Sequence, residues 1–236
     1  MRSLISPASP RYAGQRVFYG YTAEAADSDA TRSQHTETIT MIRGSNAAFG
    51  YANSPSGETF WFARVSGPQA TPEEIATTTP SQWRDHLVPL LRPDTTPAAA
   101  IVAATTDQLM VTNAVDLPPH LCWNTPRAVI IGDAAHAASP ATGQGASMAL
   151  EDAVILAKAL RDAPTTPAAL ATFDRLRRPR VENNIAASAA LTASRTPPKP
   201  GASAGTGAAE RPPALTDEEL AHQLEWTTPL PAEQPD

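Results

Sequence analysis

Short apolar segments separated by turn residues dominate the first third of the chain. Aromatic and β-branched residues favour strands, and they concentrate in the segments 15–22, 36–43, 47–53 and 58–65. Gly44-Ser45-Asn46 and Ser54-Pro55-Ser56-Gly57 supply turn chemistry between the last three segments. Strands joined by such tight turns are typical of an antiparallel meander, so we expect an antiparallel sheet here.

Longer periodic segments follow and mix helices with strands, which predicts an α/β (mixed α+β) fold. Strands are expected over 108–115 and 127–132, and helices over 80–91, 97–105, 145–162 and 167–194. Proline lacks the N–H of a helical hydrogen bond, so we expect Pro89 to limit the first helix and Pro179 to interrupt the last. The run 127–132 is continuously apolar, which is typical of a strand buried on both faces.

Composition narrows the possible functions. The 236 residues carry 18 Lys and Arg against 24 Asp and Glu, for a net charge of −6. A mildly acidic chain lacks the field that attracts nucleic acid or anionic lipid, so we expect neither as a partner. No apolar run approaches the roughly 20 residues of a membrane helix. The N-terminus has too short an apolar stretch for a signal peptide, so we expect a cytoplasmic protein.

Changes in composition divide the chain into four segments. Sheet elements concentrate in residues 1–121, and long helices follow in residues 122–195. Residues 196–214 contain five prolines and no large apolar residue, which predicts a disordered linker. The tail over 215–236 begins with Thr216 and Glu219 at the spacing of a capping box, which predicts a short terminal helix.

The stretch 127–160 carries the candidate chemistry. Asp133 follows the apolar strand directly, and open α/β sheets place ligand contacts at the carboxyl ends of strands. Gly143 and Gly145 lack a Cβ, so the backbone there can approach a planar ring closely. The helix over 145–162 is apolar on almost every side, which predicts a buried helix. Its start at Ala146-Ser147 supplies free N–H donors that would stabilise a developing anion.

Several residues of this stretch stand at the spacing of a known motif. Gly132-Asp133-Ala134-Ala135-His136 is followed by Pro140, by Gly143-Gln144-Gly145 and by Glu151-Asp152-Ala153. This arrangement resembles the second FAD-binding motif of the flavoprotein aromatic hydroxylases, the monooxygenases related to para-hydroxybenzoate hydroxylase. Ser147 departs from that family, in which the position is usually Asn.

The resemblance implies a set of cofactor-binding residues. Asp133 would hold the ribityl hydroxyls of FAD, and Pro140 would flank the isoalloxazine ring. The Gly-Gln-Gly loop and the helix start would offer amides to the N1–C2=O edge of the flavin. The expected cofactor-binding residues are Gly132, Asp133, Pro140, Gly143, Gln144, Gly145, Ala146 and Ser147.

The resemblance covers roughly residues 1–195 and also implies a fold. Residues 122–195 would form part of a Rossmann-like FAD-binding domain, and residues 1–121 an antiparallel substrate-binding sheet. The Gly-x-Gly-x-x-Gly motif that binds the FAD pyrophosphate in the family does not occur in this sequence, and the family's Asp-Gly motif would lie before Met1. We therefore expect an N-terminally truncated chain, with a complementing N-terminal chain or a second copy of itself as a partner.

By resemblance, the complete enzyme reduces FAD with NAD(P)H and uses O2 to insert one oxygen atom into an aromatic or polyketide-type small molecule. Two alternatives stay open. One is a non-catalytic remnant or partner subunit that binds an aromatic ligand, and the other is a flavin-dependent halogenase or reductase that shares the motif. Because the cofactor carries the chemistry in such enzymes, no catalytic residue is assigned, and no metal site is expected.

Four further features invite a functional or a structural interpretation. The aromatic residues of the sheet could line a pocket for a flat substrate or form its core; they are Phe49, Tyr51, Phe60, Trp61 and Phe62. His136 has no partner at metal-ligand spacing, so we expect it to hold the loop. The basic run 175–180 is expected on a solvated helix face. Cys122, the single cysteine, excludes an internal disulfide and is expected to be buried.

Overall fold

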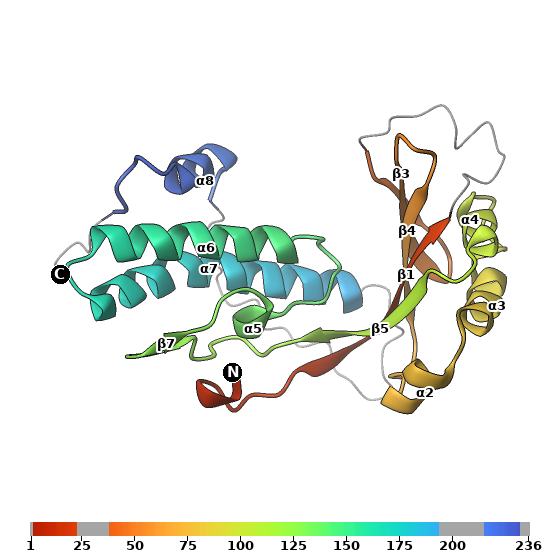
Figure 1. Cartoon of the computed structure of the whole chain (residues 1–236), viewed down its shortest axis with the longest axis horizontal. Coiled ribbons are helices and arrows are strands. Elements are labelled where there is room, and N and C mark those ends of the chain that lie inside the picture. Colours follow the sequence, from red (N-terminus) through yellow and green to blue (C-terminus); the bar gives the residue numbers. More distant parts are fainter. Residues whose placement is uncertain (1, 23–37, 194–214, 232–236) are drawn as a thin grey trace. The chain divides into compact units, whose positions relative to one another are not determined.

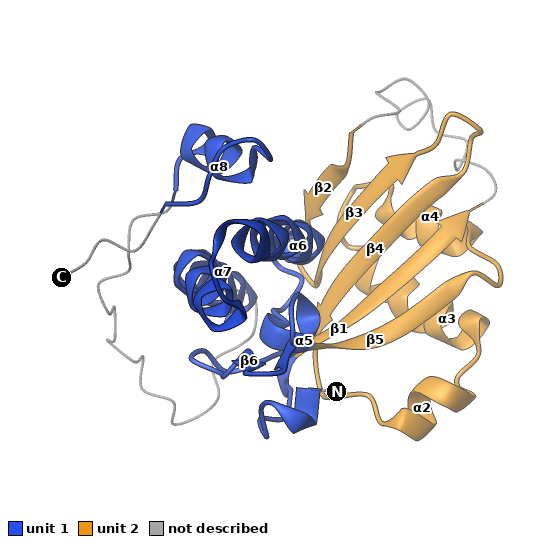
Figure 2. Ribbon diagram, turned by 60° about the vertical axis from the view of Figure 1, so that its left-hand side comes forward, with its two compact units in different colours: residues 1–13, 115–236 blue, residues 14–114 orange. Residues whose placement is uncertain are grey.

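A computed structural model describes residues 2–22, 38–193 and 215–231 of the chain. Two compact units make up these residues (Figure 2). One unit comprises residues 14–114, and the other comprises residues 1–13 together with 115–236. This division differs from the predicted boundary at residue 121. The linker predicted over 196–214 lies outside the described residues.

A five-stranded antiparallel sheet is the centre of the 14–114 unit (Figure 1), as the turn-rich pattern predicts. The strand order is β2-β3-β4-β1-β5. The strands are β1 (Arg11–Thr22), β2 (Thr40–Arg43), β3 (Ala47–Asn53), β4 (Thr59–Ser66) and β5 (Leu109–Asp116).

Three helices accompany this sheet: α2 (Pro72–Thr77), α3 (Pro80–Leu91) and α4 (Ala98–Ala104). Helix α3 begins with a capping box in which Thr79 and Gln82 satisfy each other's backbone N–H groups. Residues from α3 and α4 pack with alternate residues of the strands in one apolar core. Trp61 is fully buried there, and its Nε1 donates to Thr105 Oγ1 at 2.8 Å. One face of the sheet is therefore the core face.

The second unit is built mainly from helices. Helices α6 (Gly145–Asp162) and α7 (Thr166–Ala193) pack along each other, and Ile155 and Phe173 are fully buried in their shared core. The short elements are η1 (Arg2–Leu4), β6 (Asn124–Thr125), β7 (Ala128–Val129), α5 (Asp133–His136) and α8 (Asp217–Leu224). The predicted capping box of Thr216 and Glu219 starts α8.

Three expectations for this unit were wrong. The run 127–132 forms only the two-residue strand β7, which pairs antiparallel with β6, because no parallel neighbour exists among the described residues. Helix α7 continues through Pro179, whose ring lies on the exposed side while the residues around it are anchored by packing. Helix α6 is not buried on all sides, since Leu150 is 70% and Leu160 51% exposed.

Candidate functional site

The turn at Gly132 connects the short strand β7 to helix α5. Gly132 adopts φ 57° and ψ −144°, a backbone conformation that favours glycine. A Cβ at this position would also stand 3.0 Å from the Cβ of Ala149 on α6. The glycine therefore allows both the turn and the close approach of α6, and it leaves Asp133 at the first position of α5.

Asp152, a residue of α6, binds this turn to the helix. Its fully buried carboxylate accepts hydrogen bonds from the Gly132 N–H at 2.9 Å, from His136 Nε2 at 2.5 Å and from Arg177 Nε at 2.8 Å. Burial by itself raises the pKa of Asp152, but the bonds from His136, Gly132 and Arg177 outweigh it, so the net pKa lies below its ordinary value. A charged Asp152 thus joins α5, α6 and α7.

Glu151 extends the network towards the other arginines. Nη1 of Arg177 lies 2.7 Å from the Glu151 carboxylate, and Arg180 binds the same carboxylate through two nitrogens at 2.6 and 2.8 Å. Burial raises the pKa of Glu151, but the hydrogen bonds and charges of Arg180 and Arg177 lower it by more. The net pKa of Glu151 is therefore below its ordinary value. The expectation of a solvated basic face was therefore wrong for Arg177, which is fully buried.

His136 has the structural role that its lack of a partner at metal-ligand spacing indicates. It is 5% exposed and bonds Asp152, and its ring lies 5.5 Å from that of Trp123. Cys122 differs from the expectation of burial, since it is exposed and its Sγ donates to Asn124 O at 3.3 Å. The next residue, Trp123, which directly precedes the hairpin β6–β7, is buried in the core instead of Cys122.

The predicted cofactor residues lie on the surface above this network. Asp133, Gly143, Gln144, Gly145, Ala146 and Ser147 are all exposed, whereas Gly132 is buried and Pro140 is half-buried. A Cβ placed on Gly145 would stand 3.8 Å from Asp133 Oδ1. The structure thus brings Asp133 and the start of α6 together, although Asp133 and Gly145 are twelve positions apart in the sequence.

The start of α6 carries free hydrogen-bond donors. Gln144 occupies the N-cap position and makes no side-chain cap hydrogen bond. Gly143 has φ 69°, and a Cβ there would meet nothing within 4 Å. The loop therefore exposes uncapped N–H groups and the positive end of an 18-residue helix. A carboxylate acceptor beside such donors fits a ligand with hydroxyls and an electron-rich edge, which is the chemistry of the FAD ribityl chain and isoalloxazine ring.

The five aromatic candidates divide between the two faces of the sheet. Phe49, Tyr51 and Trp61 belong to the core beneath α3 and α4, with Phe49 stacked on Trp61 at 5.8 Å. Phe60 and Phe62 alternate with Trp61 and therefore point to the opposite face, where Phe60 lies 5.2 Å from Tyr21. The core interpretation thus holds for three of them. A substrate role for Phe60 and Phe62 stays a prediction.

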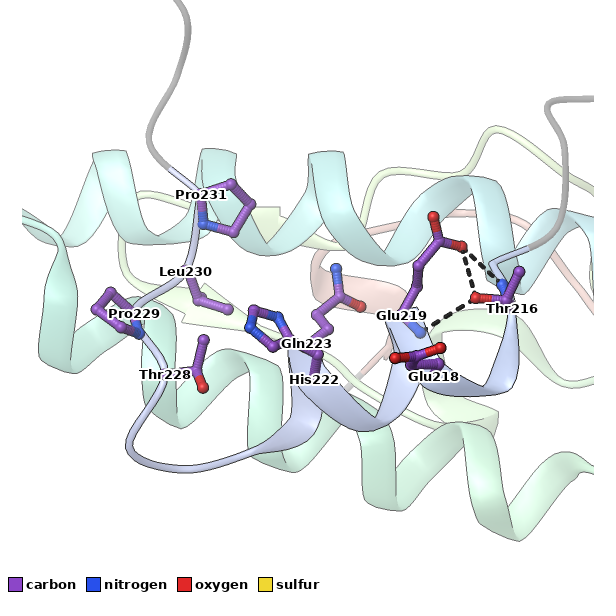
Figure 3. A pocket seen from close by; sticks show the side chains of 9 residues that line it. All are labelled: Thr216, Glu218, Glu219, His222, Gln223, Thr228, Pro229, Leu230 and Pro231. Carbon is purple, nitrogen blue, oxygen red and sulfur yellow. Dashed lines mark hydrogen bonds between the residues drawn. The ribbon is translucent and has the colours of Figure 1, made fainter.

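A cavity of about 650 Å³ lies at the C-terminal segment (Figure 3). None of the predicted cofactor residues lines it. Its walls come from α8 and the residues that follow, including His222, Gln223 and Leu230. Buried Lys158 of α6 donates to the Gln223 and Glu225 carbonyls at 2.5 and 2.6 Å, so it fastens the end of α8. A second cavity, of about 360 Å³, includes Gln144 and residues of α7 and α8.

Two classes of site have no counterpart among the described residues. No three His, Cys, Asp or Glu side chains come together there as metal ligands would. Likewise, no described helix combines the length and apolar character needed to cross a membrane.

The mixed fold with its antiparallel sheet is a fold that solved FAD-binding hydroxylases share. Residues 18–188 match the family model described as FAD binding domain, and the chain belongs to that family. The family uses FAD as its cofactor, so the expected cofactor and the expected mixed fold are confirmed.

Curated relatives are FAD-dependent monooxygenases and related enzymes. Over 190 residues the chain is 32% identical to aurachin C monooxygenase/isomerase of Stigmatella aurantiaca, covering 78% of this chain and 45% of that protein. It is 32% identical over 152 residues to 2-heptyl-3-hydroxy-4(1H)-quinolone synthase of Pseudomonas aeruginosa, covering 64% of this chain and 39% of that protein. The chain thus spans less than half the length of these relatives.

Solved structures share the fold. Klebsiella pneumoniae HpxO complexed with FAD and uric acid superposes with a TM-score of 0.65 at 22% identity, covering 81% of this chain and 47% of HpxO. The 2,6-dihydroxypyridine-3-hydroxylase from Arthrobacter nicotinovorans gives 0.69 at 15% identity, covering 85% of this chain and 56% of the hydroxylase. At these identities the likeness establishes the fold alone.

Proposed function

We propose that this chain provides the flavin-facing motif and the substrate sheet of an FAD-dependent monooxygenase. The enzyme would take electrons from NAD(P)H and transfer one oxygen atom of O2 to an aromatic small molecule. The observation that carries the proposal is the position of the Asp133 carboxylate beside the uncapped start of α6 at Gly145. The names of the curated relatives support the reaction class.

Different residues of the loop would bind different parts of FAD. Asp133 would accept hydrogen bonds from ribityl hydroxyls, and the buried network through Asp152 holds the turn that carries Asp133. The N–H groups of Gly145, Ala146 and Ser147, at the start of α6, would bind the electron-rich edge of the ring, because the helix dipole favours negative charge there. FAD itself, when bound, supplies the electron transfer and the reaction with O2.

Pro140, Gly143 and Gln144 shape the approach to the ring. The Gly143 N–H donates to Pro140 O at 3.2 Å, which closes a tight turn in the loop. Since no side chain occupies the space above Gly143, the loop backbone can lie against a flat ligand. Phe60 and Phe62, on the sheet face opposite the core, are the aromatic candidates that we assign to the substrate.

FAD titration of the purified 236-residue chain, followed by quenching of flavin fluorescence, tests the proposal. We expect saturable but weak binding, because the glycine-rich pyrophosphate motif of the family does not occur in this sequence. Asp133→Ala should weaken that binding, whereas Asp107→Ala, which changes an exposed acid before β5, should not. If wild type and Asp133→Ala bind FAD equally, Asp133 is not a cofactor ligand and the proposal fails.

A further inference from the structure

The loop between α5 and α6 is bound to α7 through buried polar side chains. Asn184, Ser188 and Thr192 stand four positions apart, so they share one face of α7, and they are 9%, 0% and 4% exposed. Buried polar groups destabilise a fold unless they form hydrogen bonds. These three bond two hydroxyl residues of the loop, Ser139 and Thr142. The C-terminal half of α7 therefore fixes the loop that precedes α6.

The hydrogen bonds of Thr142 run in one direction. Its Oγ1 lies 2.8 Å from Asn184 Oδ1 and 2.9 Å from Ser188 Oγ. An amide oxygen can only accept hydrogen bonds, so the single hydroxyl proton of Thr142 goes to Asn184. Ser188 then donates its own proton to Thr142 Oγ1. The three side chains thus form a directed chain that holds the Thr142 hydroxyl in one orientation.

This orientation bears on the start of α6, because Thr142 stands two residues before its N-cap, Gln144. The Gln144 N–H donates to Thr142 Oγ1 in a long hydrogen bond of 3.5 Å. The Gly143 N–H donates to Pro140 O at 3.2 Å. Both N–H groups between Thr142 and the helix are therefore used within the loop. The first N–H groups left to a ligand are those at the start of α6, from Gly145 onwards.

We propose that Thr142, Asn184 and Ser188 are positioning residues for the flavin, an inference that rests on the proposed function. They contact the loop, and the loop in turn places the N–H groups at the start of α6. Donors held in place before a ligand arrives bind it more tightly, because less conformational freedom is lost on binding. Such preorganised donors also stabilise a reduced, anionic ring more than the neutral oxidised one. The directed chain therefore affects both the affinity for FAD and the preference for reduced FAD.

An isosteric variant tests this role without opening a cavity. Thr142→Val keeps the shape of the side chain and removes its hydroxyl, so Asn184 and Ser188 lose their partner. We expect its affinity for oxidised FAD to fall about three- to tenfold, and its affinity for dithionite-reduced FAD to fall further. Calorimetric titration of the 236-residue chain under nitrogen measures both. Thr142→Ser, which keeps the hydroxyl, should bind both forms within about twofold of wild type.

Thr192→Val is the matched control. It removes a hydroxyl from the same face of α7, where Thr192 bonds Ser139 at 2.6 Å. Ser139 lies before Pro140, outside the part of the loop that Thr142 aligns with α6. The control should therefore lower stability as Thr142→Val does, yet bind FAD within about twofold of wild type. Equal losses of FAD affinity in the two valine variants would show a general loosening of the loop and overturn the inference.

Amide hydrogen exchange in the FAD-free chain measures the hold on the loop without any cofactor. The Met148 N–H donates to Gln144 O at 2.9 Å, which closes the first turn of α6. Because Thr142 fixes Gln144, the Met148 N–H should exchange at least about fivefold faster in Thr142→Val, and at the wild-type rate in Thr142→Ser and Thr192→Val. Exchange unaltered by Thr142→Val overturns the inference, whatever the affinity for FAD.

Asp133→Ala measured alongside these variants distinguishes the two proposals. FAD binding that is weakened by Asp133→Ala but not by Thr142→Val rejects the positioning role and leaves the proposed function intact. FAD binding that ignores Asp133→Ala rejects the proposed function and the flavin role with it, even where faster exchange in Thr142→Val confirms the hold on the loop. Weakened binding in both variants, with the control and Thr142→Ser close to wild type, supports both proposals.

Discussion

Nε of Arg177 donates a hydrogen bond of 2.8 Å to Oδ1 of Asp152, and neither side chain is exposed. The same carboxylate accepts the N–H of Gly132, the residue before Asp133. An arginine on α7 therefore determines, through one buried aspartate on α6, where the candidate cofactor turn lies. Because both charges are away from water, each depends on the other for compensation.

Arg177→Ala should destabilise the fold strongly. The change leaves Asp152 and Glu151 with fewer partners in a buried position, and removing one member of a buried ion pair typically costs about 3–5 kcal/mol. Urea unfolding monitored by circular dichroism measures the loss. Arg175→Ala, at an exposed position of the same helix, is the control and should stay within about 0.5 kcal/mol of wild type. Equal losses in the two variants would show that the buried network contributes nothing special.

Elements whose limits are set by local pattern could be predicted to the residue. The expected strand over 47–53 and helix over 145–162 coincide with β3 and α6. In β3 a turn on each side bounds the apolar run. In α6 a glycine-rich loop ends where a long helical pattern begins. Local sequence is sufficient in such places, because the competing conformations are excluded within a few residues.

The wrong expectations concern residues whose environment comes from distant parts of the chain. The basic run 175–180 predicts a solvated helix face, yet Arg177 is buried because it forms ion pairs with Glu151 and Asp152 of another helix. The signal was present, since two adjacent acids stood in a helix predicted to be buried. Similarly, an apolar run such as 127–132 cannot show that the available partner is the short strand β6.

Asp133→Ala should weaken FAD binding far more than it alters the fold. A hydrogen bond to a charged group contributes about 1.5–3 kcal/mol, which corresponds to about a ten- to hundredfold change in affinity. The carboxylate is exposed and lies outside the Asp152 network, so the urea midpoint should not change. In an enzyme completed with an N-terminal half, flavin reduction on bound FAD should slow much less, because ribityl hydroxyls do not change charge during reduction. Intact affinity with abolished reduction would contradict this placement of Asp133.

Acid should release the C-terminal residues that follow α8. The hydrogen bonds from Arg161 and the Leu230 N–H lower the pKa of Asp162 to about 2 from an ordinary value of 3.8. A lowered pKa means that the stabilisation is complete above pH 3.8 and is lost as the pH falls towards 2. Arg161 also lies 4.6 Å from the Trp226 ring, so this tryptophan reports the release.

The measurement is the difference in fluorescence between wild type and Trp226→Phe. We expect the Trp226 emission to shift to the red as the pH falls from about 4 to 2, where Asp162 takes up its proton. Asp162→Asn should show the shifted emission already at pH 6 and no further change in that window. A wild-type titration that Asp162→Asn reproduces would assign the transition to another group.

Valine at Gly132 and valine at Gly145 should differ in their effect on the melting temperature. At Gly132 the backbone has φ 57°, and a Cβ would stand 3.0 Å from the Ala149 Cβ. Gly132→Val should therefore lower the melting temperature, because both the backbone and the contact with α6 are strained. At Gly145 a Cβ would meet only Asp133 Oδ1, at an ordinary distance of 3.8 Å. The valine variant there should fold with a melting temperature close to wild type.

Gly145→Val should nevertheless weaken FAD binding, since the new side chain stands between Asp133 and the uncapped donors of α6. In a completed enzyme it should also lower the flavin reduction potential, because the amides at the helix start stabilise the anionic reduced ring more than the oxidised one. Calorimetric melting, FAD titration and a redox titration measure the three effects. An unchanged FAD affinity in the folded Gly145→Val variant would place the cofactor elsewhere, because no ligand that uses these donors can avoid a side chain at residue 145.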